Sequence, residues 1–452
     1  MRGSRLFVVL VASGVMLALG LAGFAWTLAA GSSEAQQGAM HNCPDSGKWS
    51  IAVWEGDDGA SLDQALATCT GDVAAAYAID SATGQWKHWF SGKAELSNLS
   101  TVDDMEGMLA LGAATTPGTP TLPAGWTKIE PGGETICSTG TPYAYWVHPG
   151  TVNRLVVYFE GGGACWDDIT CSDPGTYFDS AVDNTGPEHL YLADGIGNFD
   201  NPDNPFKDWF QVFVPYCTGD VHWGNATTTY HWGGADHTIY HKGFVNVSAV
   251  LDWIEAGFEK PDKIFVTGRS AGSYGSVMGA AYIHAIYPDV PVYQLGDSGS
   301  GVITEDFLQN SFQTWGAVQN LPDWIPALQV PFTELTMTKI YSALANYYSN
   351  DRWSQYNTAY DEEQEFFYAV MGGQIADWSD FMMASIQEIE DNAPSFRSYT
   401  APGQIHGITN RDIFYSREVE GVKFSDWVEA LVNDQPWESV KCTDCETDPE
   451  AP

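Results

Sequence analysis

A serine stands between two glycines in the segment Gly268-Arg269-Ser270-Ala271-Gly272, directly after a run of β-branched and aromatic residues. The run Ile264 to Thr267 suits a buried strand, and the small residues that follow as far as Pro288 suit a helix. A Gly-x-Ser-x-Gly pattern at such a turn is typical of a nucleophile elbow, which strains the backbone and exposes the serine hydroxyl. We therefore predict that Ser270 is a nucleophile, and that side chains in place of the two glycines would collide with the neighbouring strand and helix.

A serine nucleophile requires a base, and the acid and then the histidine follow the serine along chains with this elbow. Only His284 and His406 follow Ser270. His284 lies within the helix that begins at the elbow, and we expect it to point away from the hydroxyl. His406 comes just after the last predicted strand, "FRSYTAPG", so we predict that it is the base.

Two carboxylates are candidates for the group that orients the base. Asp361 follows the penultimate predicted strand, "WSQYNTAYD", and Asp297 follows the strand before it, "VPVYQLGD". We favour Asp361 on the usual order of the three partners, with Asp297 as the alternative. We interpret Glu362 and Glu363 as exposed residues at a helix start, where the helix dipole stabilises them.

Acyl transfer also requires hydrogen-bond donors that face the developing oxyanion. Three consecutive glycines, Gly161, Gly162 and Gly163, end the segment "RLVVYFEGGG". They match the HGGG-type loop of esterases, except that Glu160 takes the place of the histidine. We predict that their amides form an oxyanion hole together with the amide of Ala271.

Strands and helices alternate after residue 126 and must position these groups. "PYAYWVHPG", "RLVVYFEGGG" and "WFQVFVPYC" have the composition of strands, and apolar residues from Phe244 to Phe258 recur at spacings of three and four, as on one helix face. Such alternation predicts an α/β fold, with a mainly parallel sheet covered by helices on both faces. We expect residues 307–349 to form a lid over the carboxyl edge of the sheet.

The Thr/Pro/Gly-rich segment 113–125 reads as a linker between two parts of the chain. Before it, residues 41–112 show short apolar strands with turn residues between them, which predicts a small β-rich module. Trp49, Trp54, Trp86 and Trp89 could form a face that stacks on sugars, but we prefer the interpretation that they fill the core of a small domain. The main domain is predicted over 126–440, followed by an acidic tail over 441–452.

Residues 1–35 have the order of a secretory signal. Arg2 and Arg5 precede an apolar stretch from Leu6 to about Ala30, and small and polar residues follow. We favour cleavage near Ala30 or Ala35, although the stretch is long enough for an uncleaved signal anchor. The protein is therefore expected to be extracellular, either free or anchored to the cell surface.

Eight cysteines in an exported chain indicate disulfides. Position along the chain suggests the pairs Cys43 with Cys69, Cys137 with Cys217, Cys165 with Cys171, and Cys442 with Cys445. The sequence alone leaves this pairing open.

The charge balance argues against several partners. In 452 residues, 58 acidic side chains face 19 basic ones, a formal net charge of -39, so we predict no nucleic-acid partner and no attraction to anionic membranes. His222, His231, His237 and His241 match no zinc spacing, and prolines break a calcium-like segment at 198–206. We expect no metal and no cofactor.

The motifs "YFEGGGACW", "VFVPYCTGDVHWG", "VTGRSAGSYG", "AYDEEQ" and "SYTAPGQIHGI" together resemble the pectinacetylesterase and Notum family of secreted serine carboxylesterases. The resemblance extends from Trp126 to Tyr415 and leaves out the N-terminal module. It implies an α/β-hydrolase fold, a triad of Ser270, Asp361 and His406, and no metal. The chain differs from the animal members in having fewer cysteines, and it carries an extra module.

These observations predict a monomeric serine carboxylesterase that removes acyl groups, preferably acetyl, from a polysaccharide through an acyl-enzyme. One alternative is a lipase-like enzyme or protein deacylase that acts on longer acyl chains. Another is a non-catalytic surface protein that binds polysaccharide through the N-terminal module. Contact with a membrane is expected only if the N-terminal segment is retained as an anchor.

Overall fold

The computed structural model describes residues 38–44, 48–69, 73–81, 83–90, 97–112, 118–183, 185–187 and 191–446. The chain divides into two compact units, 1–115 and 116–452. The predicted signal peptide or anchor lies outside the described residues, as does the second half of the predicted acidic tail, 447–452. Within the described residues, no helix combines the length and the apolar composition that crossing a membrane requires.

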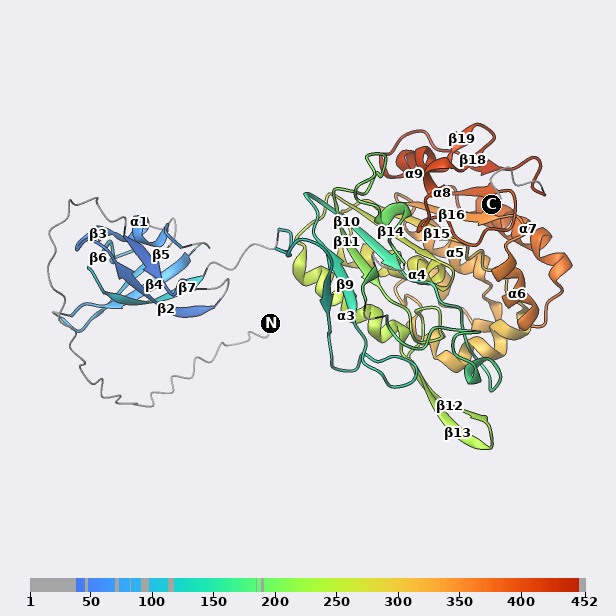
Figure 1. The fold of residues 1–452 in the computed structure, drawn as a ribbon, viewed down its shortest axis with the longest axis horizontal. Coiled ribbons are helices and arrows are strands. Elements are labelled where there is room, and N and C mark those ends of the chain that lie inside the picture. The colour runs from blue at the N-terminus through green and yellow to red at the C-terminus, as the bar shows by residue number, and fades with distance from the viewer. Residues whose placement is uncertain are drawn as a thin grey trace. The chain divides into compact units, whose positions relative to one another are not determined.

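The first unit is built on a five-stranded antiparallel sheet with the strand order β1-β2-β7-β4-β5 (Figure 1). The strands are β1 (Ala39–His41), β2 (Trp49–Glu55), β4 (Val73–Ile79), β5 (Trp86–Phe90) and β7 (Gly107–Gly112). A short helix, α1 (Leu62–Leu66), and the paired strands β3 (Ala60–Ser61) and β6 (Thr101–Val102) complete the unit. The predicted β-rich module is thereby confirmed.

The four tryptophans of this unit lie on opposite faces of the sheet. Trp54 and Trp89 are buried in its core, whereas Trp49 and Trp86 are 50% and 58% exposed. Successive side chains of a strand point to opposite faces of the sheet. Each strand therefore places one of its two tryptophans on the core face and the other on the opposite face. The core interpretation is therefore right for two tryptophans and wrong for the other two.

The second unit contains a nine-stranded sheet with the order β20-β17-β16-β15-β14-β10-β11-β9-β8. Seven neighbouring strands are parallel: β10 (Val152–Phe159), β11 (Trp209–Val214), β14 (Lys263–Arg269), β15 (Val292–Asp297), β16 (Arg352–Thr358), β17 (Phe396–Ala401) and β20 (Val440–Lys441). At one edge, β8 (Thr127–Ile129) and β9 (Tyr145–His148) run antiparallel. This mainly parallel sheet, with the helices packed on it, confirms the predicted fold class.

Helices connect the strands and cover the sheet (Figure 1). They are α3 (Gly243–Gly257), α4 (Ala271–Ile286), α5 (Met337–Tyr347), α6 (Glu362–Val370), α7 (Ile375–Asn392), α8 (Ile413–Ser416) and α9 (Phe424–Val432). The helix predicted from the apolar spacing after Phe244 is α3. Helix α4 packs against β10, β14 and β15. It begins two residues after the carboxyl end of the central strand β14.

Two hairpins and the segment predicted as a lid are added to this layered core. The hairpin of β12 (Ala226–Trp232) and β13 (Ala235–His241) projects from the body of the unit (Figure 1). The segment predicted as a lid consists of short helical turns from Phe307 to Glu334, followed by α5. The remaining hairpin joins β18 (Glu418–Val419) and β19 (Val422–Lys423).

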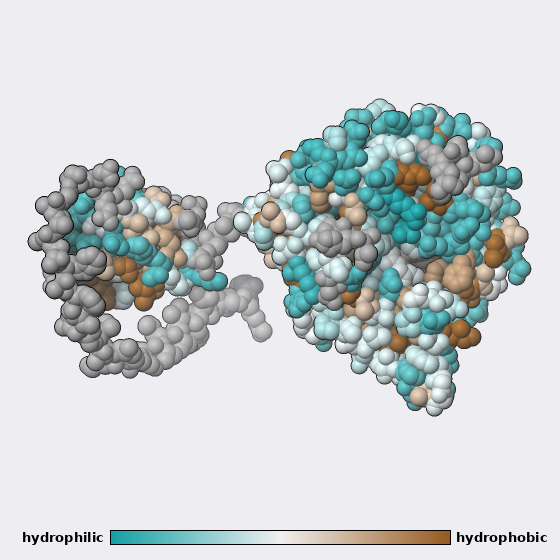
Figure 2. All heavy atoms as spheres, viewed as in Figure 1, coloured by the Kyte–Doolittle hydropathy of each residue, from teal (hydrophilic) through white to brown (hydrophobic). Residues whose placement is uncertain are grey.

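All four predicted disulfides are present: Cys43–Cys69, Cys137–Cys217, Cys165–Cys171 and Cys442–Cys445. Hydrophilic residues cover much of the visible face of the second unit, as the acidic composition requires (Figure 2).

Candidate active site

Ser270 occupies a strained turn between β14 and α4. Its backbone has φ 58° and ψ -122°, a combination that is costly for a residue with a side chain. A Cβ atom on Gly272 would collide with the carbonyl oxygen of Phe159, and one on Gly268 would collide with the carbonyl of Gly272. The glycines thus permit the close approach of strand and helix that the sequence pattern predicted.

His406 and Asp361 are in direct contact. The Nδ1 atom of His406 lies 2.8 Å and 2.9 Å from the two carboxylate oxygens of Asp361, and both side chains are buried. Asp361 is also the N-cap of α6, because its Oδ1 atom accepts hydrogen bonds from the amides of Glu363 and Gln364. The start of the helix therefore fixes the carboxylate, and the carboxylate fixes the imidazole.

Asp297, the alternative acid, has different partners. Its Oδ2 atom accepts hydrogen bonds from the amides of Ile408 and Thr409, at 2.9 Å and 2.8 Å, and from the hydroxyl of Thr409. Its backbone carbonyl accepts the amide of Ser270 at 2.8 Å. Asp297 thus holds both the elbow and the segment that follows His406, without contacting the imidazole. This arrangement favours Asp361 as the orienting acid.

The glycine loop after β10 presents two of its three amides. The Gly161 amide donates a hydrogen bond to the hydroxyl of Tyr191 at 2.7 Å, so this structure does not favour the expected place of Gly161 among the oxyanion donors. Gly162 and Gly163 have φ of 148° and 70°. Among the described residues, their amides donate to no group, and the amide of Ala271 is the first of α4. Gly162, Gly163 and Ala271 remain the candidates for oxyanion donors.

Glu160, which replaces the histidine of the esterase loop, is hydrogen-bonded to the protein through both its side chain and its carbonyl. Its Oε2 atom accepts the amide of Tyr216 at 2.9 Å, and its backbone carbonyl lies 2.8 Å from Nε2 of His222. Burial raises the pKa of Glu160 to about 8 and lowers the pKa of His222 to about 4. Both groups are therefore neutral near pH 7. Their hydrogen bonds hold the residue that precedes the glycine loop in place.

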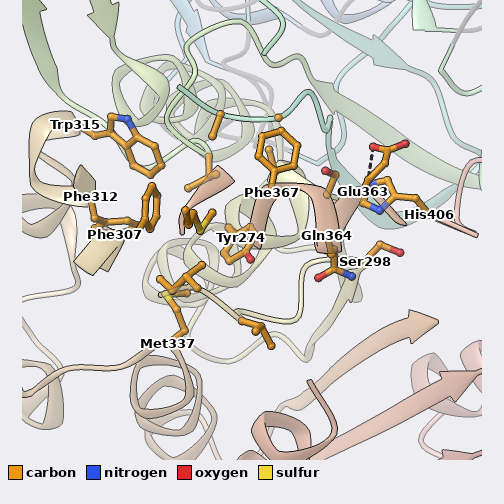
Figure 3. A pocket seen from close by; sticks show the side chains of 18 residues that line it. Tyr274, Ser298, Phe307, Phe312, Trp315, Met337, Glu363, Gln364, Phe367 and His406 are labelled. Carbon is orange, nitrogen blue, oxygen red and sulfur yellow. Dashed lines mark ion pairs between the residues drawn. The ribbon is translucent and has the colours of Figure 1, made fainter. Parts of the chain in front are cut away.

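An apolar pocket opens beside Ser270 and His406 and encloses about 640 Å³ of space between atoms, part of it open to solvent. Figure 3 shows aromatic side chains at one end of this pocket and the polar groups at the other. Most of its apolar wall comes from the predicted lid, the adjoining loop and α6: Val302, Ile303, Phe307, Phe312, Trp315, Met337, Phe367 and Met371.

A second, more polar pocket meets the first at Ser270. Both are lined by Gly163, Ser270, Glu363, Phe367 and His406. The second is also lined by the other glycines of the loop and by Tyr177, Asp179 and Arg269. Ser270 therefore lies at the junction of an apolar space and a polar one, as an ester with an apolar acyl group and a polar alcohol would require.

Glu363 is exposed in the first turn of α6, as expected from the sequence, but it also lines both pockets, which sequence reasoning missed. Its Oε2 atom lies 3.3 Å from Nε2 of His406, and its Oε1 atom lies 3.7 Å from Nη2 of Arg269. The position next but one to Asp361 was a signal, because residues in the first turn of α6 follow the acid into the site. The direction in which that turn faces depends on how α6 packs, which the local sequence does not reveal.

The four histidines of the segment after β11 do not converge. Each has a protein partner: the Glu160 carbonyl for His222, Asp236 for His231, the Trp232 ring for His237, and Tyr230 and Thr218 for His241. In the described part of the chain, the one cluster with the spacing of metal ligands is Cys165, Cys171 and His241, and its two cysteines are joined as a disulfide.

Comparisons with known proteins place the chain among esterase sequences. The pectinacetylesterase family model matches residues 128–327. Palmitoleoyl-protein carboxylesterase notum2 of Xenopus laevis is 25% identical over 175 residues, which is 36% of this chain and 34% of the relative. Pectin acetylesterase 7 of Arabidopsis thaliana is 26% identical over 183 residues, 39% of this chain and 45% of the relative. The chain thus covers less than half the length of either relative.

A solved structure has the same fold. The Wnt deacylase Notum from Drosophila matches with a TM-score of 0.53 and 15% sequence identity, over 70% of this chain and 96% of that one. At this identity the match speaks for the fold alone.

Proposed function

Because this chain belongs to the pectinacetylesterase and Notum family, we propose that it is a carboxylic ester hydrolase that works through an acyl-enzyme on Ser270. The observation that carries the proposal is the contact between His406 and Asp361 at a pocket that the strained Ser270 also lines. A strained serine, an oriented imidazole and unused backbone amides are the parts that acyl transfer requires.

In this mechanism, Nε2 of His406 takes the proton of the Ser270 hydroxyl as its oxygen attacks the ester carbonyl. The Gly162, Gly163 and Ala271 amides stabilise the negative charge on the carbonyl oxygen. Collapse of the tetrahedral intermediate breaks the bond to the alcohol, which leaves with the proton from His406. Water then attacks the acyl-enzyme by the same route, and the acid is released with Ser270 restored.

The apolar pocket supports an acyl group longer than acetyl. A two-carbon acyl group would leave most of the wall formed by Phe307, Phe312, Trp315 and Met337 unoccupied, whereas a longer apolar chain would be desolvated there. This feature favours the lipase-like or protein deacylase alternative. The acetyl preference expected from the sequence stays a prediction.

The proposal is tested by hydrolysis of nitrophenyl esters from acetyl to palmitoyl by the full chain, with Ser270→Ala as the control. We expect kcat/KM to rise beyond acetyl, and Ser270→Ala to lose at least about 10³-fold while its circular dichroism spectrum is unchanged. Retained activity in Ser270→Ala would contradict the mechanism, and a profile limited to acetyl would contradict the acyl preference.

Polysaccharide binding by the first unit is a second candidate function, supported by the exposed rings of Trp49 and Trp86 and by Tyr77 beside Trp49 at a ring distance of 5.8 Å. Aromatic faces of this kind can stack on sugar rings. Loss of retention on insoluble polysaccharides in the full-length Trp49→Ala/Trp86→Ala variant would support it, and unchanged retention would speak against it.

We also propose that the protein is exported. Four disulfides among the described residues support an oxidising compartment. Retention of the chain at the cell surface, rather than release, would indicate that the N-terminal segment remains as an anchor.

A further inference from the structure

Glu363 lies beside Nε2 of His406, the atom that protonates the leaving alcohol in the proposed mechanism. We propose that this carboxylate makes the enzyme select esters whose alcohol part carries no negative charge, so that polymers of uronic acid are poor substrates. The inference rests on the proposed esterase function and concerns the alcohol that this site accepts.

The position of the alcohol follows from the mechanism. For His406 to protonate the leaving oxygen, that oxygen must come within about 3.2 Å of Nε2. The Oε2 atom of Glu363 lies 3.3 Å from the same nitrogen. The two distances sum to about 6.5 Å, which is the largest separation that the leaving oxygen and the carboxylate oxygen can have. The charge of Glu363 therefore acts on the alcohol at short range.

The charged side chains of the polar pocket leave an excess of negative charge. Asp179 and Glu363 are acidic, and Arg269 is the one guanidinium in the lining. The Nη2 atom of Arg269 lies 3.7 Å from the Oε1 atom of Glu363, so this cation offsets one of the two carboxylates and leaves the other unbalanced. Tyr177 and Phe367 contribute aromatic rings, which can accept a neutral or cationic group.

The charge of the whole chain acts in the same direction. A net charge of -39 repels polyanions at long range, and salt screens this repulsion. Glu363 acts at short range, where its effect can be separated from the general field by a single substitution.

Glu362 supplies a matched control for such a substitution. It is the neighbouring residue in the first turn of α6 and carries the same charge near the same helix N-terminus, but it lines neither pocket at Ser270. Glu362→Gln and Glu363→Gln therefore change the net charge and the interaction with the helix dipole alike. Only Glu363→Gln removes the carboxylate beside His406.

The test uses three butyryl esters with alcohols of similar size: choline, which is cationic, 3,3-dimethylbutanol, which is its neutral isostere, and 4-hydroxybutanoate, which is anionic. The values of kcat/KM are measured for the full chain and both variants at low and high ionic strength. We expect the unsubstituted enzyme at low salt to prefer the choline ester over the anionic ester by about tenfold or more. Glu363→Gln should reduce this ratio at least threefold, and Glu362→Gln should change it less than twofold.

The outcomes separate the two proposals. Hydrolysis of the neutral ester with no preference between the charged esters would overturn the inference and leave the esterase intact. Equal reductions of the ratio in Glu362→Gln and Glu363→Gln, or none in Glu363→Gln, would assign the selectivity to the general field and also overturn it. Failure to hydrolyse any of the three esters, or the nitrophenyl series, would overturn the proposed function itself and the inference with it.

Discussion

At the scale of single residues, Asp361 and Asp297 both reach the neighbourhood of Ser270 and His406, but they hold different atoms. Asp361 contacts the imidazole, whereas Asp297 accepts backbone amides from the segment after His406 and from Ser270. A carboxylate that accepts Nδ1–H selects the tautomer in which Nε2 can take a proton. A carboxylate that accepts backbone amides stabilises a loop.

Substitution separates these two roles. Asp361→Asn should lower kcat by about 10³- to 10⁴-fold, because the imidazole loses the acceptor that fixes its tautomer. Asp297→Asn should instead lower stability by about 1–3 kcal/mol, since an uncharged amide oxygen accepts the Ile408 and Thr409 amides less strongly than a carboxylate oxygen does. Steady-state kinetics and urea unfolding of both variants measure the difference. A larger loss of kcat at Asp297 than at Asp361, at equal folded fraction, would reassign the acid.

His222 makes stability depend on pH. Burial lowers its pKa to about 4 in the folded protein, compared with about 6.5 in the unfolded chain. Between these values the unfolded state binds the proton and the folded state does not, so stability falls as the pH falls from about 6.5 to about 4. Replacing His222 with Gln removes this contribution.

The measurement is the free energy of unfolding of the protein and of His222→Gln at several pH values. The advantage of the unsubstituted protein should shrink by up to about 3 kcal/mol over that interval. His241, whose pKa burial also lowers to about 4, acts in the same direction, and Glu160, whose pKa burial raises to about 8, acts in the opposite one. Both groups are present in the unsubstituted protein and in His222→Gln, so their contributions largely cancel in the difference between the two. A difference that does not vary with pH would disprove the assignment.

At the scale of elements, the site forms where the carboxyl ends of β10, β14, β15 and β16 meet one edge of the sheet. The glycine loop, the elbow and Asp361 each follow one of these strands, and Asp297 ends β15. Parallel neighbours in register bring the ends of distant segments together, which is why residues from 161 to 406 share one pocket. The short turns after β15 and helix α6 then close the apolar side.

Filling the apolar pocket should shorten the preferred acyl chain. Met371, at the C-terminal end of α6, lines this pocket and is half-buried, so Met371→Trp adds bulk to the wall. We expect kcat/KM for long-chain esters to fall at least tenfold relative to butyryl esters, because the chain can no longer be buried. The control is Met383→Trp on α7, where a half-buried methionine lies outside the pocket lining. Equal effects of both substitutions would contradict the placement of the acyl chain.

At the scale of the whole molecule, disulfides span very different lengths of chain. Cys137–Cys217 closes a loop over a separation of 80 residues, and Cys442–Cys445 closes one over 3. In the chain-entropy account, the longer loop restricts the unfolded state more strongly.

Removing the long-range pair should therefore cost more stability. We expect about 4 kcal/mol for Cys137→Ala/Cys217→Ala and about 2 kcal/mol for Cys442→Ala/Cys445→Ala. Urea unfolding followed by tryptophan fluorescence compares the two double variants with the unsubstituted chain. A larger loss for the short-range pair would show that loop entropy is not the main contribution of these bonds.

Much of this protein is predictable from local pattern. The elbow at Ser270, the glycine loop after β10, the parallel sheet and the β-rich first unit follow from the periodicity of strands and from glycines that allow close packing. Cysteine positions also suggested the correct pairs. Chain order, combined with the place of His406 just after the last predicted strand, which is β17, singled out His406 as the candidate base.

Tertiary structure decided what depends on the direction of side chains. It brought Asp361, rather than Asp297, to the imidazole, occupied the Gly161 amide with Tyr191, and turned Glu363 toward His406. It also divided the four tryptophans of the first unit between core and surface. The physical reason is the same in each case: sequence periodicity determines which element a residue joins, but the face it presents is set by packing against elements distant in the chain.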